Sequence, residues 1–143
     1  MSWAPKQTVI APVDFSDASY NAVEVARKIV ADPSGLHIVH VIPSPTLFEP
    51  ASLINKLDHS ATYHASMEAI RQHLGEKYQE SQVNVLFGDP GSEIAAFADR
   101  LNADLIVISS HGRGGVKRIL LGSVAERVLQ LARCPVLVLR REE

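Results

Sequence analysis

The amino-acid sequence predicts an α/β fold, in which one parallel sheet of five strands carries helices on both faces. The first observation is a set of short apolar runs, most of them β-branched and nearly continuous, as in strands covered on both sides. The second is that segments with apolar residues at helical spacing separate these runs. Strand and helix therefore alternate along all 143 residues, which favours one domain spanning residues 1–143.

The same patterns place each element. Strands are expected at residues 9–13, 36–42, 83–87, 105–108 and 136–139. The first helix follows Ser16 or Asp17, either of which can cap its N-terminus. Asp89-Pro90 introduces the third helix, because a capping residue followed by a first-turn proline is typical of a helix start. The apolar stripes of the four expected helices are Ala22, Val23, Ala26, Ile29 and Val30; Met67, Ile70, Leu74 and Tyr78; Ile94, Phe97, Ala98 and Leu101; and Val124, Val128, Leu131 and Ala132.

Composition argues against several classes of function. The net charge of −2 provides no overall basic field for nucleic acid. No apolar run approaches the ~20 residues that span a bilayer, so no membrane partner is expected. The first residues lack the apolar region of a secretory signal, and a cytoplasmic location is therefore expected. Cys134 is the only cysteine, and the spacing of the six histidines favours no metal site.

A loop rich in glycine and basic residues joins the fourth strand to the fourth helix. A strand, a glycine loop and a helix N-terminus together can bind an anion, because free backbone N–H groups and the helix dipole favour negative charge. Gly112 and Gly122 are separated by nine residues, and Ser123 follows directly. Ser123 and Glu126 also form an S-x-x-E pattern, which predicts a capping box worth roughly 1 kcal/mol without any ligand.

This loop resembles the phosphate loop of the ATP-binding universal stress proteins, G-x2-G-x9-G-[S/T]. Ser109 stands at the first glycine position, while Gly112, Gly122 and Ser123 match. The resemblance covers essentially the whole chain and includes Gly88-x-Pro90 and Cys134-Pro135. It implies a Rossmann-like sheet of the adenine-nucleotide alpha-hydrolase type, with strand order 3-2-1-4-5.

Asp14 is the candidate for the nucleoside side of the site. It follows the first strand, where a carboxylate can accept hydrogen bonds from ribose hydroxyls or an exocyclic amine, or can simply begin the first helix. The resemblance favours the first alternative and adds Val41, whose backbone is expected to meet the adenine, although Val41 alone would be assigned to the core. The full set of expected binding residues is Pro12, Val13, Asp14, Val41, Ser109, Gly112, Arg113, Gly122, Ser123 and Val124.

The resemblance implies a nucleotide-responsive stress or regulatory module. The expected ligand is ATP, ADP or AMP, with Mg²⁺ held through the phosphates, and hydrolysis is expected to be slow at most. Family members commonly form homodimers through the last strand. The serine at position 109 leaves open an alternative, a nucleotide-free dimeric module that acts through protein partners. An enzyme of a related adenine-nucleotide fold is less favoured, because Asp14-Phe15-Ser16-Asp17 does not provide a pyrophosphatase loop and no Walker A pattern is present.

Overall fold

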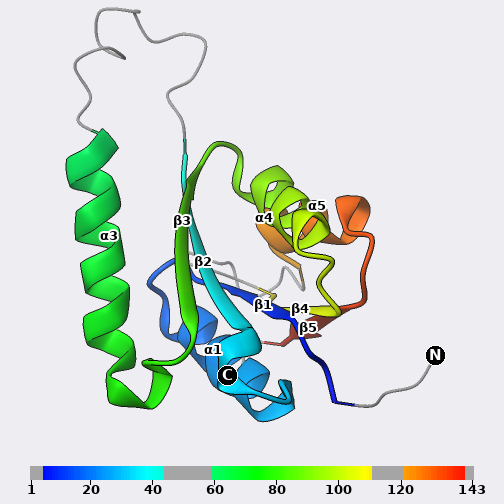
Figure 1. Cartoon of the computed structure of the whole chain (residues 1–143). Helices are drawn as coiled ribbons and strands as arrows, with labels where there is room; N and C mark the ends of the chain where they lie inside the picture. Colours follow the sequence, from blue (N-terminus) through cyan, green and yellow to red (C-terminus); the bar gives the residue numbers. More distant parts are fainter. Residues whose placement is uncertain (1–4, 44–58, 111–120, 141–143) are drawn as a thin grey trace, which may run out of the picture.

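The computed structural model describes residues 5–43, 59–110 and 121–140. They form a five-stranded parallel sheet with strand order β3-β2-β1-β4-β5, as predicted (Figure 1). The strands are β1 (Val9–Pro12), β2 (Leu36–Ile42), β3 (Gln82–Phe87), β4 (Leu105–Ser109) and β5 (Val136–Leu139). The α-helices are α1 (Asp17–Ile29), α3 (His59–Leu74), α4 (Pro90–Arg100) and α5 (Ser123–Leu131); the short 3-10 helices are η1 (Pro33–Gly35) and η2 (Glu76–Tyr78).

Two hydrophobic clusters, one on each face of the sheet, form the core. Helices α1 and α3 cover one face, where Val9, Ala11 and Ile38 are buried. Helices α4 and α5 lie together over the other face, where Ile10 and Val39 are buried (Figure 1). Neighbouring strand residues such as Val9 and Ile10 alternate between the two clusters, because side chains of a strand point to opposite faces. The strand sequences are almost continuously hydrophobic because helices cover both faces of the sheet.

Side-chain caps define the starts of two helices. Ser16 is the N-cap of α1, and its hydroxyl oxygen accepts a hydrogen bond from the N–H of Ser19 at 3.1 Å. Between the two candidates, Ser16 therefore caps the helix and Asp17 is its first residue. Asp89 caps α4 through the N–H of Ser92 at 3.0 Å, and Pro90 begins the helix. The prediction from Asp89-Pro90 is confirmed.

Two of the predicted apolar stripes were partly wrong. Helix α3 ends at Leu74, and Tyr78 reaches the core from η2 instead, because Gly75 turns the chain with a φ of 73°. In α5, Val124 is 37% exposed and Leu131 is 44% exposed, while Ala125 and Val128 are buried. The helix is therefore rotated relative to the prediction, so that its small residue Ala125 faces the α4 side of the core.

Candidate functional site

The strand order changes direction between two neighbouring strands, β1 and β4. From β1 the chain adds β2 and then β3 on one side, whereas β4 and β5 lie on the other. All five strands are parallel, so the loops after β1 and β4 leave the same edge of the sheet and diverge. Ligands of open α/β sheets bind at such a switch point, beyond the carboxyl ends of the strands. The predicted residues after β1 and β4 belong to these two loops.

After β1, Asp14 is held in a tight turn by two serines of the α1 region. Its Oδ1 accepts hydrogen bonds from the N–H of Ser16, at 3.0 Å, and from the Ser16 hydroxyl. Its own N–H donates to Ser19 Oγ at 3.2 Å. Phe15, inside the turn, has a φ of 68°, which a non-glycine residue seldom adopts. The half-buried carboxylate thus helps to begin α1 and at the same time has a fixed direction at the edge of the sheet.

The aliphatic candidates near this turn offer their backbone more than their side chains. Pro12 lies opposite Val39 and is buried. Val13 is 4% exposed, and its N–H donates to the Val39 carbonyl at 2.8 Å. Val41 is 7% exposed and packs in the core on the α4–α5 face. The side chains of all three residues are therefore buried, and the contact of the Val41 backbone with adenine stays a prediction.

On the β4 side, a contact absent from the sequence prediction closes the glycine loop. Ser110 is 3% exposed, and its N–H donates to the carbonyl of Leu139 at 2.8 Å. Its own carbonyl accepts a hydrogen bond from the N–H of Gly122. The start of α5 is therefore drawn back to the end of β4, beside the half-buried Ser109. The only sequence signal for this role was a small polar residue directly after an apolar strand.

Gly112 and Arg113, the remaining predicted residues of the loop, lie outside the described residues.

The predicted capping box at Ser123 was wrong. Gly122 is the N-cap of α5, with φ −73° and ψ 164°, and the N–H of Glu126 donates to the Gly122 carbonyl at 2.9 Å. Ser123 is then the first helical residue, one position too late for its hydroxyl to cap the helix, and it is exposed. Within the part of the chain that the structure describes, no side chain caps α5. Its first N–H groups are left for another acceptor, and the helix dipole favours an anion there.

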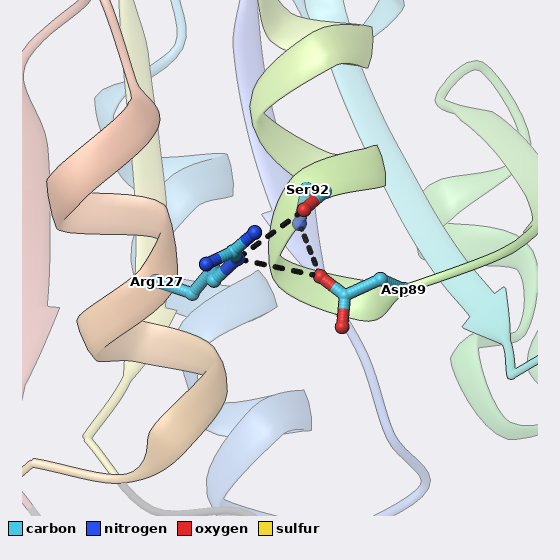
Figure 2. Close-up of polar contacts among 3 residues, drawn as sticks. All are labelled: Asp89, Ser92 and Arg127. Atoms are coloured by element: carbon cyan, nitrogen blue, oxygen red, sulfur yellow. Dashed lines mark hydrogen bonds and ion pairs between the residues drawn. The ribbon is translucent and has the colours of Figure 1, made fainter.

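The first turn of α4 is also joined to the middle of α5 (Figure 2). Arg127 Nε donates to Ser92 Oγ at 3.3 Å and lies 3.6 Å from Asp89 Oδ2. Hydrogen bonds from Ser92, and then the charge of Arg127, lower the pKa of the Asp89 carboxyl. Both charged side chains are more than half exposed, so the ion pair adds little stability. The contacts with Asp89 and Ser92 nevertheless direct the guanidinium of Arg127 toward α4.

The region beneath the Asp14 turn is aromatic. Tyr20 of α1 is 8% exposed and stacks on His73 of α3, with ring centroids 3.6 Å apart and planes 15° apart. Burial, and secondarily the negative charge of Asp14, raise the pKa of the Tyr20 phenol. Tyr20 therefore remains neutral at physiological pH and packs the α1–α3 side below the turn.

The histidines of β2 face opposite sides of the sheet, as their spacing predicts. His37 packs edge-on against Phe97 of α4, with centroids 6.1 Å apart, and His40 lies against Phe15, with centroids 4.5 Å apart. Among residues 5–43, 59–110 and 121–140, no group of three or more histidine, cysteine or acidic residues is placed to hold a metal ion. The same residues include no helix long and apolar enough to cross a membrane.

Comparison with known proteins gives one consistent family. The model of the universal stress protein family matches residues 6–140. The chain is 35% identical over 139 residues to universal stress protein MJ0531 of Methanocaldococcus jannaschii, an alignment that covers 93% of this chain and 81% of that protein.

Solved structures agree. That of MJ0577, also from M. jannaschii, has a TM-score of 0.80 at 29% identity and covers 98% of this chain and 99% of its own. A universal stress protein in complex with cAMP has a TM-score of 0.63 at 23% identity, covering 97% and 100% of the two chains. At that identity the likeness concerns the fold.

Proposed function

The chain belongs to the universal stress protein family, and we propose that it binds an adenine nucleotide at the switch point between β1 and β4. The observation that carries the proposal is the start of α5. Ser110 holds Gly122 at the end of β4, and no side chain among the described residues caps the helix that follows. Uncapped N–H groups beside a glycine loop suit a phosphate.

The two loops divide the ligand between them. Asp14, fixed by Ser16, accepts hydrogen bonds from ribose hydroxyls, while the backbone of Val41 meets the adenine. Pro12 and Val13 form the floor between these groups. On the other side, the N–H groups of Ser123 and Val124 bind the phosphates beside Gly122, together with Ser109 and the Gly112 and Arg113 segment of the loop.

The ligand is ATP, or ADP or AMP, and Mg²⁺ enters with the phosphates. Asp14 supports binding more than hydrolysis, because its Oδ1 already accepts two hydrogen bonds from Ser16. The proposed activity is therefore a nucleotide-responsive change in a stress or regulatory module, with slow hydrolysis at most. A cytoplasmic location and the lack of a nucleic-acid partner, from the net charge of −2, belong to the same proposal.

A homodimer through β5 completes this proposal. Strand β5 pairs only with β4 in the described sheet, and all four of its apolar residues, Val136–Leu139, are only half-buried. Leu129 and Leu131 of α5 are each 44% exposed. An apolar edge strand that lies open invites pairing, and a second copy of the same edge is a matching partner.

Calorimetric titration of nucleotide-stripped protein with ATP and Mg²⁺, alongside melting temperature, tests the nucleotide proposal. We expect saturable binding of one nucleotide per subunit and a ligand-dependent rise in melting temperature. Gly122→Val should abolish binding and keep the fold, because φ −73° and ψ 164° are open to valine. The control is Gln130→Val, which places the same side chain on an exposed position of α5. Absence of heat and thermal shift at millimolar ATP would instead favour the nucleotide-free module.

A further inference from the structure

His40 links β2 to the turn that carries Asp14. Its Nδ1 lies 2.8 Å from the carbonyl oxygen of Val13. A carbonyl can only accept, so Nδ1 carries the hydrogen and the tautomer is fixed by this contact. The Val13 carbonyl lies one residue beyond the paired part of β1, which ends at Pro12 opposite Val39. The imidazole therefore continues the link between β1 and β2 past the last paired residues.

The same ring supports the strained part of the turn. Phe15 has a φ of 68°, and its ring centroid lies 4.5 Å from that of His40 with planes tilted by 56°. Non-glycine residues persist in this conformation only where neighbouring groups hold them. Phe15 packs against the core cluster under α1 and α3, and His40 contacts it from β2. The side chain of His40 thus contacts the residues on both sides of Asp14: the backbone carbonyl of Val13 and the ring of Phe15.

The turn is held from two directions. Ser16 and Ser19 bind Asp14 from the start of α1, through its carboxylate and its N–H respectively. His40 binds Val13 and contacts Phe15 from the neighbouring strand. The serines fix Asp14 relative to α1, whereas His40 fixes the turn relative to the sheet edge, where Val41 is the next residue of β2.

We infer that His40 is a positioning residue of the nucleotide site: it acts through Val13 and Phe15 to hold the Asp14 carboxylate at a fixed place relative to the backbone of Val41. This inference rests on the proposed function. His40 does not itself need to touch the ligand. Its effect is preorganisation, because a turn already in its binding conformation loses less conformational freedom when the ligand binds.

His37, on the same strand, provides a matched control. It is half-buried and in contact with Phe97, but on the opposite face of the sheet, and its buried Nδ1 has no hydrogen-bond partner among the described residues. Any effect of replacing a β2 histidine as such should appear at both positions. An effect on the Asp14 turn should appear only at His40.

The experiment compares His40→Gln, His40→Asn and His37→Gln. The asparagine amide nitrogen corresponds to Nδ1 and can still donate to Val13, whereas the glutamine nitrogen lies one atom farther out. For each variant, two quantities are measured: the affinity for ATP with Mg²⁺, and the amide hydrogen exchange of residues 13–19 in the unliganded protein. Melting temperature serves as the check on folding.

We expect His40→Gln to weaken affinity roughly five- to tenfold, the scale of one lost hydrogen bond, and to speed exchange in residues 13–19. His40→Asn should recover most of both properties, and His37→Gln should change neither. Wild-type affinity and exchange in His40→Gln, or an equal loss in His37→Gln, would overturn the inference. If the wild-type protein binds no nucleotide, the proposed function fails. Hydrogen exchange then tests the structural part of the inference by itself: faster exchange confined to residues 13–19 in His40→Gln shows that His40 holds the turn, and unchanged exchange rejects this.

Discussion

Asp104 and Thr8 are joined twice: the N–H of Asp104 donates to the Thr8 carbonyl at 2.8 Å, and the N–H of Thr8 donates to the Asp104 carboxylate at 2.9 Å. The same carboxylate oxygen accepts a hydrogen bond from the N–H of Gln7, also at 2.9 Å. One acidic residue before β4 thereby fixes the chain that enters β1. These are the two strands whose far ends border the proposed site.

Replacing Asp104 should therefore destabilise the fold. Hydrogen bonds to a charged group contribute about 1.5–3 kcal/mol when shielded, and this site is only partly buried, so we expect Asp104→Ala to lower the free energy of unfolding by about 1–2 kcal/mol. Asp104→Asn keeps a side-chain oxygen and should lose less. Urea unfolding monitored by circular dichroism measures both. Equal losses in the two variants would show that the charge, more than the acceptor, holds the entry to β1.

Gly91 should be intolerant of any side chain. A Cβ added there would lie 2.5 Å from Arg127 Cβ and Cγ and 3.4 Å from the Val124 carbonyl oxygen, so α4 and α5 would have to separate. Alanine is normally better than glycine in a helix by up to about 1 kcal/mol, but overpacking costs about 1–3 kcal/mol. We therefore expect Gly91→Ala to be destabilising in thermal or urea unfolding. Ala96→Gly, at an exposed position of α4, measures the helix-propensity effect alone.

His37 should make the protein less stable in mild acid. Burial lowers the pKa of its imidazole below the ordinary value of 6.5. The unfolded chain then binds a proton more readily than the folded one, so stability is full above about pH 6.5 and falls as the pH drops through the folded pKa. Urea unfolding between pH 5 and 8 should show a smaller acid loss in His37→Leu than in the wild-type protein. Parallel curves for the two proteins would contradict this assignment.

Ser123→Ala separates structure from ligand binding at the start of α5. Because Gly122 is the cap and Ser123 is exposed, the variant should change the free energy of unfolding by less than about 0.5 kcal/mol. A side-chain cap would have cost about 1 kcal/mol. If the hydroxyl contacts phosphate, ATP affinity falls while melting temperature without nucleotide is unchanged. A large loss of stability would instead show that the Ser123 hydroxyl caps α5.

Ser109→Gly tests the departure from the glycine pattern. Ser109 ends β4, pairs with Leu139 and is half-buried. We expect nucleotide affinity to stay the same or rise, because glycine allows the backbone closer to the ligand. The cost should be about 0.5–1 kcal/mol of stability, since glycine is unfavourable in a strand. Titration with ATP and a melting curve give the two values, and a large loss of affinity would reveal a contact made by the Ser109 side chain.

Local sequence signals predicted the parts of this fold that depend on neighbouring residues. Each expected strand and helix is present, because hydrophobic periodicity reports which faces will be buried. Asp89-Pro90 located the start of α4. The stripe on α5 was partly wrong because local periodicity does not account for the neighbouring helix, and α4 approaches α5 closely where Gly91 lies against Arg127. The strand order followed from family resemblance, not from the patterns themselves.

The candidate site divides in the same way. The sequence by itself determined its ingredients: an acidic residue after β1, a glycine loop after β4, and a helix that follows this loop. Only the tertiary structure shows which polar groups of these segments already form hydrogen bonds within the protein. Ser110 to Gly122 and His40 to Val13 join residues 12 and 27 positions apart, and the uncapped start of α5 depends on the backbone angles of Gly122. Such contacts lie beyond local patterns because a hydrogen bond forms only when packing brings donor and acceptor within reach.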